Sequence, residues 1–398
     1  MRTTRLVGAV VLVLVGCDPA ASSGGSPALP VRDVALGSSE ACAIDRLGEV
    51  WCWGDAANFR GELSMTGADN TCVAPFVSAG TPSVFGTCIT PRPRKPKLVT
   101  EALRGANAVE LSVGPGFGLC VRTEDGKVRC WKGNAFEVTS GDLVIKQFDT
   151  NSVGWCGLTM AGAAWCYVEK NTEPLRAVPG AQAFTQISAG AFSYLALDDA
   201  KNAWAGTLDA APRTTELSPS TPFMLALPGP VKDAQVSAQY WVTAPQAFEA
   251  NQCQLEATGA IRCTGWNTYG QLGNGMFRAM GGGSGRVTSL VASEIAVGAT
   301  HVCALSEAGE VSCWGSSWAG ELGATAPSLC DLGGNMSVAC RATPAPVGGL
   351  APASHVWAGI NFTCAELKTG ELKCWGANDK GQLGNDSGGT AVTTTIGR

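Results

Sequence analysis

The segment CAELKTGELKCWGANDKGQLG (residues 364–384) contains the pattern that decides the fold of this chain. Cys364 and Cys374 are ten residues apart, and Gly370 lies six residues after the first cysteine. This odd spacing excludes a two-residue hairpin loop, whereas a three-residue loop with a left-handed glycine at its third position sets the cysteines opposite each other. Opposed cysteines on antiparallel strands lie within disulfide reach. The segment therefore predicts a β-hairpin closed by a disulfide.

The same spacing recurs along the chain, which has 17 cysteines. The pairs ten residues apart on this pattern are Cys42 with Cys52, Cys120 with Cys130, Cys156 with Cys166, Cys253 with Cys263, Cys303 with Cys313 and Cys364 with Cys374. The glycines six residues after the first cysteine are Gly48, Gly126, Gly162, Gly259, Gly309 and Gly370. An even number of cysteines in the mature part of an exported chain argues against reduced cysteines in the core. Zinc binding is also disfavoured, because the sequence has no Cys-x-x-Cys motif and no Cys/His cluster. We therefore expect six hairpin disulfides.

A seventh unit without cysteines lies in the middle of the chain. It begins at Ile187-Ser188-Ala189-Gly190, and Leu195 and Ala205 stand at the spacing of the two cysteines. Losing both cysteines together is what a paired contact predicts. Seven units of about 36–60 residues, rich in strand and turn signals, favour a closed β-propeller. A solenoid is the alternative, although it would need a cap at each end.

Further motifs flank the hairpins. An apolar-x-x-Gly segment precedes five of the units, and Phe148–Asn151 is a variant of it before another. Trp-Gly followed by Gly-Gln/Glu-Leu-Gly follows the hairpins of the best-formed units. Unit six supplies Gly298, His301, Ala304, Leu305, Gly309, Trp314, Gly315, Gly320, Leu322 and Gly323, and unit seven adds Asn378 and Gln382. These residues resemble the regulator of chromosome condensation repeat family. The resemblance implies an all-β, seven-bladed propeller of four-stranded blades. Units two to four have lost the Gly-Gln-Leu-Gly segment.

The expected organisation has three parts. Residues 1–16 form a lipoprotein signal peptide, 17–30 a flexible tether, and 31–398 the propeller. The expected repeat units are 31–100, 107–142, 144–180, 184–228, 231–275, 293–347 and 353–396. Because the chain stops soon after unit seven, we expect the strand near Val31–Leu36 to complete the last blade and so remove free edges.

The N-terminal segment predicts export. Arg2 and Arg5 precede an apolar stretch, Leu6–Val15, that is too short to span a membrane. Leu14-Val15-Gly16-Cys17 looks like a bacterial lipobox, in which Cys17 is lipidated. An ordinary signal peptide is the alternative. We expect an envelope lipoprotein held only by its lipid, at the outer membrane or cell surface rather than the inner membrane.

Composition argues against several functions. The net charge of −5 gives no electrostatic footprint for nucleic acid, and two histidines leave few ways to build an imidazole metal site. We expect no cofactor and no metal. His301 and His355 are interpreted as structural, and Asp198-Asp199 as turn residues rather than a catalytic pair. Gly281–Gly285 lacks a P-loop lysine and predicts a flexible loop. The basic run Pro91–Lys97 predicts a stiff connector, with contact to an acidic polymer as the alternative.

Two inserts are the least repeat-like segments. Residues 64–95 carry Cys72 and Cys88, and residues 324–343 carry Cys330 and Cys340. A disulfide within each insert predicts that the insert is ordered. Because the two inserts leave their blades at the same point of the repeat, we expect them on the same face of the propeller. Long ordered loops are often functional. Phe76, Phe85 and Trp318 are the candidate partner-binding anchors. Decoration without a partner is the alternative.

The sequence thus predicts a non-enzymatic, monomeric scaffold that binds an envelope or secreted protein. By resemblance alone, family members include a nuclear exchange factor for a small GTPase and a secreted β-lactamase inhibitor. Export argues against the exchange role, because the GTPase would be in another compartment. The alternative is an envelope glycan-binding protein, or a glycan-active hydrolase or lyase. A carboxylate-lined funnel would favour the enzyme, and an aromatic platform would favour glycan binding.

Overall fold

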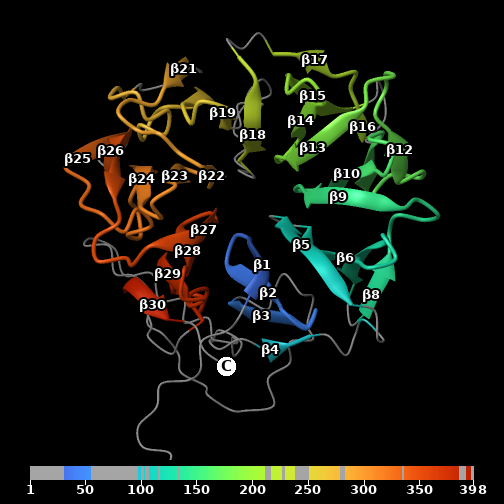
Figure 1. Cartoon of the computed structure of the whole chain (residues 1–398), viewed down its shortest axis with the longest axis horizontal. Helices are drawn as coiled ribbons and strands as arrows, with labels where there is room; N and C mark the ends of the chain where they lie inside the picture. Colours follow the sequence, from blue (N-terminus) through green and yellow to red (C-terminus); the bar gives the residue numbers. More distant parts are fainter. Residues whose placement is uncertain are drawn as a thin grey trace, which may run out of the picture.

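Seven antiparallel sheets stand around a central axis, as expected for a β-propeller (Figure 1). The computed structural model describes residues 31–54, 97–99, 103, 107–114, 117–132, 135–210, 217–225, 229–237, 251–277, 283–333, 336–384 and 391–395. These residues contain strands, turns and loops but no α-helix. Each sheet is a blade whose first strand faces the axis.

The first four blades follow one another along the chain. Blade 1 contains β1 (Val31–Leu36), β2 (Glu40–Asp45), β3 (Val50–Gly54) and β4 (Lys97–Leu98). Blade 2 contains β5 (Ala108–Gly114), β6 (Gly118–Thr123), β7 (Val128–Lys132) and β8 (Ala135–Val138). Blade 3 contains β9 (Ile145–Thr150), β10 (Gly154–Thr159), β11 (Ala164–Val168) and β12 (Leu175–Ala177). Blade 4 contains β13 (Phe184–Ala189), β14 (Ser193–Asp198), β15 (Ala203–Ala210), β16 (Leu217–Pro219) and β17 (Phe223–Met224).

The last three blades complete the ring. Blade 5 contains β18 (Val231–Val236), β19 (Gln252–Glu256), β20 (Ile261–Gly265) and β21 (Gly283–Arg286). Blade 6 contains β22 (Glu294–Val297), β23 (His301–Leu305), β24 (Val311–Ser316), β25 (Ser328–Gly333) and β26 (Met336–Pro346). Blade 7 contains β27 (Ala353–Ala358), β28 (Phe362–Leu367), β29 (Leu372–Gly376) and β30 (Ala391–Thr395).

The six predicted hairpin disulfides are confirmed. In each pair the two cysteines lie directly opposite each other on the second and third strands of a blade, with Cα–Cα distances of 4.0–4.1 Å. The bonded pairs are Cys42 with Cys52, Cys120 with Cys130, Cys156 with Cys166, Cys253 with Cys263, Cys303 with Cys313, and Cys364 with Cys374.

The turn geometry of these hairpins also agrees with the prediction. The six loop glycines have φ between 74° and 93°. In blade 4, Leu195 opposes Ala205 as expected. Lys201 takes the place of the loop glycine there, with φ 64°. The hairpin of blade 4 therefore keeps the register and turn of the others without a disulfide.

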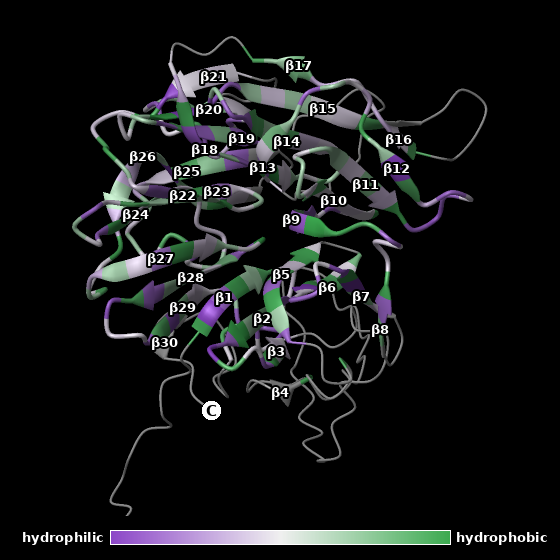
Figure 2. Ribbon diagram, turned by 45° about the vertical axis from the view of Figure 1, so that its right-hand side comes forward, coloured by the Kyte–Doolittle hydropathy of each residue, from purple (hydrophilic) through white to green (hydrophobic). Residues whose placement is uncertain are grey.

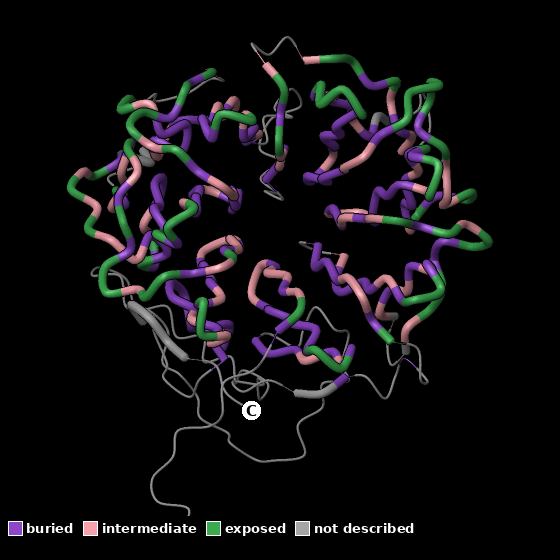
Figure 3. The backbone as a smooth tube through the Cα atoms, in the orientation of Figure 1, coloured by how far each residue is buried: buried purple, intermediate pink, exposed green. Residues whose placement is uncertain are grey.

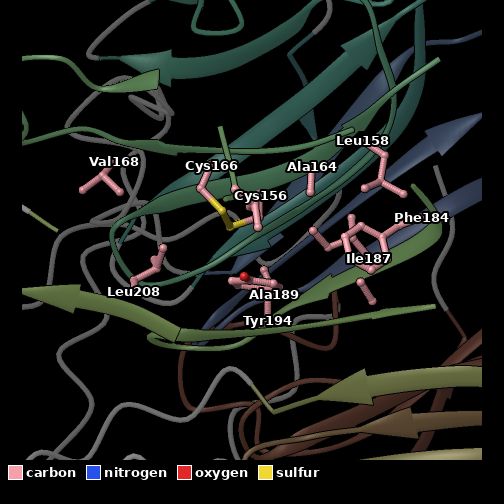
Figure 4. Packing of buried hydrophobic residues seen from close by; sticks show 12 residues of the cluster. Cys156, Leu158, Ala164, Cys166, Val168, Phe184, Ile187, Ala189, Tyr194 and Leu208 are labelled. Carbon is pink, nitrogen blue, oxygen red and sulfur yellow. A yellow bond between two sulfur atoms is a disulfide. The ribbon is translucent and has the colours of Figure 1, made fainter. Parts of the chain in front are cut away.

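The hydrophobic core is divided among the seven spaces between neighbouring blades. One cluster of buried residues fills each space, including the space between blades 7 and 1. Each hairpin disulfide faces a neighbouring blade; the bond between Cys156 and Cys166, for example, packs toward Ala189 and Tyr194 of blade 4 (Figure 4). Buried residues follow the inner parts of the blades, and exposed ones gather at the periphery and in loops (Figure 3). The molecule is a closed ring, which excludes the solenoid.

The expected closure of the ring by Val31–Leu36 is wrong. β1 is the innermost strand of blade 1, and β30 supplies the outer strand of blade 7. Ala391–Thr395, near the end of unit seven, form that outer strand, so no strand has to be shared. Side-chain packing closes the ring instead, together with hydrogen bonds such as Trp53 Nε1 to the Gln382 carbonyl (2.9 Å).

The glycine-rich segment of blade 5 also differs from expectation. Gly283–Arg286 form the outer strand β21 instead of a flexible loop, so blade 5 extends past residue 275, the expected end of unit five. Glycine is required there for close packing, because a Cβ on Gly285 would lie 2.6 Å from Nδ2 of Asn274.

Candidate functional site

The insert of blade 6 is an ordered β-hairpin. β26 continues past the edge of β24 and pairs with β25, which makes blade 6 five-stranded. The predicted disulfide between Cys330 and Cys340 is confirmed and joins these two strands, with a Cα–Cα distance of 5.9 Å. The hairpin is therefore a fixed extension of the propeller.

Trp318 lies at the base of this hairpin and is exposed. Its side chain is 62% exposed, and Leu329 on β25 is 75% exposed. The fully buried carboxylate of Glu321 fixes the backbone of the Trp318 turn, because it accepts the N–H groups of Trp318 (3.0 Å) and Ala319 (2.7 Å). Burial raises the pKa of Glu321. The fixed turn holds an indole ring in solvent.

A loop of blade 5 adjoins the hairpin. Tyr269 packs against Cys330, Val338 and Cys340, and the N–H of Gly275 donates to the Ala342 carbonyl (2.9 Å). The next two residues, Met276 and Phe277, are exposed. We call the four exposed apolar residues Met276, Phe277, Trp318 and Leu329 the blade 5–6 surface. Of these residues only Trp318 was predicted, because isolated exposed apolar residues carry no periodic signal in the sequence.

The other predicted anchors and cysteines have different outcomes. Phe76, Phe85, Cys72, Cys88 and the lipidation residue Cys17 lie outside the described residues. The expected proximity of the two inserts therefore stays a prediction. Most of the basic run at 91–97 also lies outside them, and its last residue, Lys97, begins β4.

A central cavity of about 470 Å³ lies at the axis, and the innermost strands of all seven blades line it. Hydrophilic residues interrupt the hydrophobic ones on inner strands such as β1 and β9 (Figure 2). The third position of each innermost strand is the same point of the repeat. The residues at this position are Asp33, Glu110, Gln147, Gln186, Asp233, Glu294 and His355, with β22 counted from Ala292. This ring was not predicted from the sequence, because the residue type at the third position changes from blade to blade.

These side chains connect neighbouring blades. Asp33 Oδ2 accepts the N–H of Leu111 in blade 2 (3.0 Å), and Glu110 Oε1 accepts that of Phe148 in blade 3 (3.2 Å). Glu294 Oε1 accepts the N–H of Val356 in blade 7 (3.0 Å). An innermost strand has one edge without a partner strand, and its N–H groups need acceptors when buried. The ring supplies those acceptors.

Burial dominates the electrostatics of the cavity. It raises the pKa of Asp33 to about 6 and that of Glu110 to about 7. Burial also raises the pKa of Asp149, which accepts hydrogen bonds from Ser112 of blade 2 (2.7 Å) and Ala189 of blade 4 (2.9 Å). The carboxyl groups are thus both desolvated and engaged with the backbone of adjoining blades.

The two histidines and Asp198, which the sequence singled out, contact neighbouring residues of the fold. His301 is fully buried, its Nε2 lies 2.9 Å from Thr363 Oγ1, and burial lowers its pKa to about 4. His355 Nδ1 lies 3.0 Å from Glu294 Oε2. Asp198 accepts hydrogen bonds from Asn202 and Trp204 within its hairpin turn. Among the described residues, no group of three or more histidine, cysteine or acidic side chains is arranged for a metal ion.

The repeats of blades 6 and 7 are similar to repeats of known proteins. The profile of the regulator of chromosome condensation (RCC1) repeat matches residues 292–317 and 354–382, which are the inner strands of blades 6 and 7. The chain carries RCC1 repeats. The human protein RCC1 domain-containing protein 1 is 26% identical over 324 residues, covering 67% of this chain and 78% of the relative.

The RCC1-type fold also agrees with a solved structure. The crystal structure of human WBSCR16 is 15% identical, covers 85% of this chain and 87% of its own, and superposes with a TM-score of 0.59. The many disulfides are consistent with an extracytoplasmic protein. In the part of the chain that the structure describes, no helix has the length and hydrophobicity to cross a bilayer.

Proposed function

We propose that this protein is a non-enzymatic, lipid-anchored scaffold of the cell envelope that binds another exported protein through its insert loops. The observation that carries the proposal is the blade 5–6 surface, in which a disulfide-fixed hairpin holds Leu329 in solvent and the turn at its base holds Trp318 there. Exposed apolar residues on a rigid support fit a protein interface, because large aromatic and aliphatic side chains supply most of its binding energy.

The opposite face of the propeller provides a control surface for the binding experiment. The blade 6 insert lies at the end of the blade where the third strand finishes, whereas the hairpin turns between second and third strands lie at the opposite end. Leu47 and Met160 are in these turns and are 74% and 69% exposed. The two ends therefore offer apolar residues of similar exposure on opposite faces.

The test is cross-linking of the mature protein to an envelope extract, with captured proteins identified by mass spectrometry. The double variant Trp318→Ser, Leu329→Ser should lose the main captured protein, while Leu47→Ser, Met160→Ser should keep it. Equal capture by both double variants would contradict the use of this surface. For the anchor, Cys17→Ser should move the protein from the membrane fraction to the soluble fraction, and retention would contradict lipidation.

A glycan-active enzyme is the second candidate, and the carboxylate-lined central cavity favours it. The contacts of these carboxyl groups favour the scaffold, because Asp33 and Glu110 already accept backbone N–H groups and Glu110 Oε2 pairs with Arg122 Nε (2.7 Å). Incubation with purified envelope glycan distinguishes the two: release of soluble fragments that Glu110→Gln abolishes would establish the enzyme.

A further inference from the structure

Five carboxyl groups share the central cavity. They come from five different innermost strands: Asp33 from β1, Glu110 from β5, Asp149 from β9, Asp233 from β18 and Glu294 from β22. Like charges in a low-dielectric cavity oppose one another's ionisation, and the loss of water opposes it further. Asp33 is close enough to Glu110, and Asp233 to Glu294, for each pair to repel when ionised.

Few basic groups compensate this charge. Arg122 on β6 forms the ion pair with Glu110, and His355 on β27 faces Glu294. Arg32 and Lys232 act on Asp33 and Asp233 from adjacent positions in the same strands. Asp149 is surrounded by Ser112, Ser188 and backbone N–H groups, and no charged side chain is among its main influences. Ionising all five groups therefore leaves excess negative charge at the axis.

The same carboxyl groups hold blades together. Asp33, Glu110 and Glu294 each accept an N–H group from the following blade, and Gln186 Nε2 of blade 4 donates to Asp233 of blade 5. We propose that closure of the ring is coupled to proton uptake in the central cavity, so that the propeller gains stability as its surroundings become acidic. This inference does not depend on the proposed binding function.

The sign of the effect follows from the pKa values. Burial raises the pKa of Asp33 from 3.8 to about 6 and that of Glu110 from 4.5 to about 7, and it raises those of Asp149, Asp233 and Glu294. The folded protein therefore holds more protons than the unfolded chain between about pH 4 and pH 7. The free energy of unfolding rises as the pH falls through this window, and the gain is complete below the unfolded pKa values.

His301 acts in the opposite direction. Its pKa is lowered to about 4, so its contribution to stability is lost as the pH falls below its unfolded value of 6.5. His355 also complicates a direct test, because its Nδ1 lies 3.0 Å from Glu294 Oε2. The experiment therefore compares variants that share the same His301 and lack His355.

The test measures Tm from pH 8 to pH 5 for the single variant His355→Gln and for the double variant that adds Glu294→Gln. The amide that replaces the Glu294 carboxyl keeps an acceptor for the Val356 N–H but cannot ionise, so only the titration is removed. We expect the Tm of the single variant to rise by roughly 1–2 °C more than that of the double variant on acidification. Equal gains, or a larger gain in the double variant, would overturn the proposal.

Asp125→Asn serves as the control. Asp125 lies in the hairpin turn of blade 2, and its hydrogen bonds with Arg129 and Thr123 outweigh burial and lower its pKa to about 2. Its stabilisation is present above pH 4 and lost as the pH falls through about 2. This variant should therefore keep the full gain in Tm between pH 8 and pH 5, and loss of the gain would contradict an origin in the cavity.

Discussion

Blades 5 to 7 and blades 2 to 4 join their neighbours by different means. In the first group, the Gly-Gln/Glu-Leu-Gly loop offers a carbonyl to a buried tryptophan of the next blade. Trp314 Nε1 donates to the Gln271 carbonyl (3.0 Å), Trp375 Nε1 to the Glu321 carbonyl (2.9 Å) and Trp53 Nε1 to the Gln382 carbonyl (2.9 Å). One motif thus makes the same contact at three junctions.

Blades 2 to 4 lack this loop, and different residues fill the space at each of their junctions. Trp155 Nε1 reaches back to Thr139 Oγ1 of blade 2 (2.9 Å), and its ring stacks with Tyr167 at a centroid distance of 6.1 Å. In blade 4, Tyr194 packs against blade 3 residues in the space between the two blades, while its hydroxyl donates to the Ser220 carbonyl of its own blade (2.7 Å). The difference shows that the ring requires a filled, hydrogen-bonded space between blades, whereas the residues that fill it can change.

The largest expected effect is the loss of a tryptophan from the first group. Trp314 is fully buried between blades 5 and 6, so Trp314→Ala should lower the free energy of unfolding by about 3–5 kcal/mol. Chemical denaturation measures the change. The control is the exposed Trp318→Ala, which should stay within about 0.5 kcal/mol of the parent protein. Similar losses in both variants would contradict the role given to burial.

A pair of Phe variants separates the hydrogen bond from the packing. Trp314→Phe removes the side-chain donor of the Gln271 carbonyl, whereas after Trp375→Phe the Glu321 carbonyl keeps the Thr363 hydroxyl as a donor (2.8 Å). An unsatisfied buried carbonyl costs about 1–3 kcal/mol. The Trp314 variant should therefore lose more stability in denaturation experiments, and the reverse order would show that packing dominates.

The disulfides give the next effect. Replacing both Cys303 and Cys313 by alanine should lower the free energy of unfolding by about 2–3 kcal/mol, as expected when a short loop is released in the unfolded chain. Conversely, the double variant Leu195→Cys, Ala205→Cys in blade 4 should form a disulfide, because these residues already oppose each other. Denaturation measures the loss, and mass spectrometry with a thiol-blocking reagent detects the new bond. Free thiols at 195 and 205 would show that blade 4 differs in geometry from the others.

The smallest expected effect concerns the hairpin turn of blade 4. Lys201→Gly should raise the free energy of unfolding by about 0.5–1 kcal/mol, because φ of 64° is strained for lysine and natural for glycine. Gly309→Ala in blade 6 should do the opposite, since its Cβ would lie 2.8 Å from the Ala353 carbonyl. Thermal unfolding of the two variants measures whether each substitution raises or lowers stability. A loss of stability in Lys201→Gly would contradict the strain argument.

The sequence predicted those parts of the fold that depend on short spacings. The ten-residue cysteine interval determined register, turn type and even the cysteine-free pair Leu195 and Ala205. The axial carboxylates could not be predicted in the same way, because the partners of Asp33 and Glu110 are 78 and 38 residues away and their residue types vary around the ring. The wrong expectation for Val31–Leu36 has a similar cause, since only the assembled ring shows which blade a terminal strand joins.

Ring closure has a consequence for how the chain can be rearranged. Every blade is built from one continuous stretch, and the first and last described strands lie in adjacent blades. The junction between blades 7 and 1 is made by the same tryptophan contact as those between blades 5 and 6 and between blades 6 and 7, except that no peptide bond crosses it. Circular permutation, with the natural ends linked and new ends opened between two other blades, should leave every sheet whole. The position of the N-terminus, and with it any anchor it carries, is thus an adjustable property of the ring.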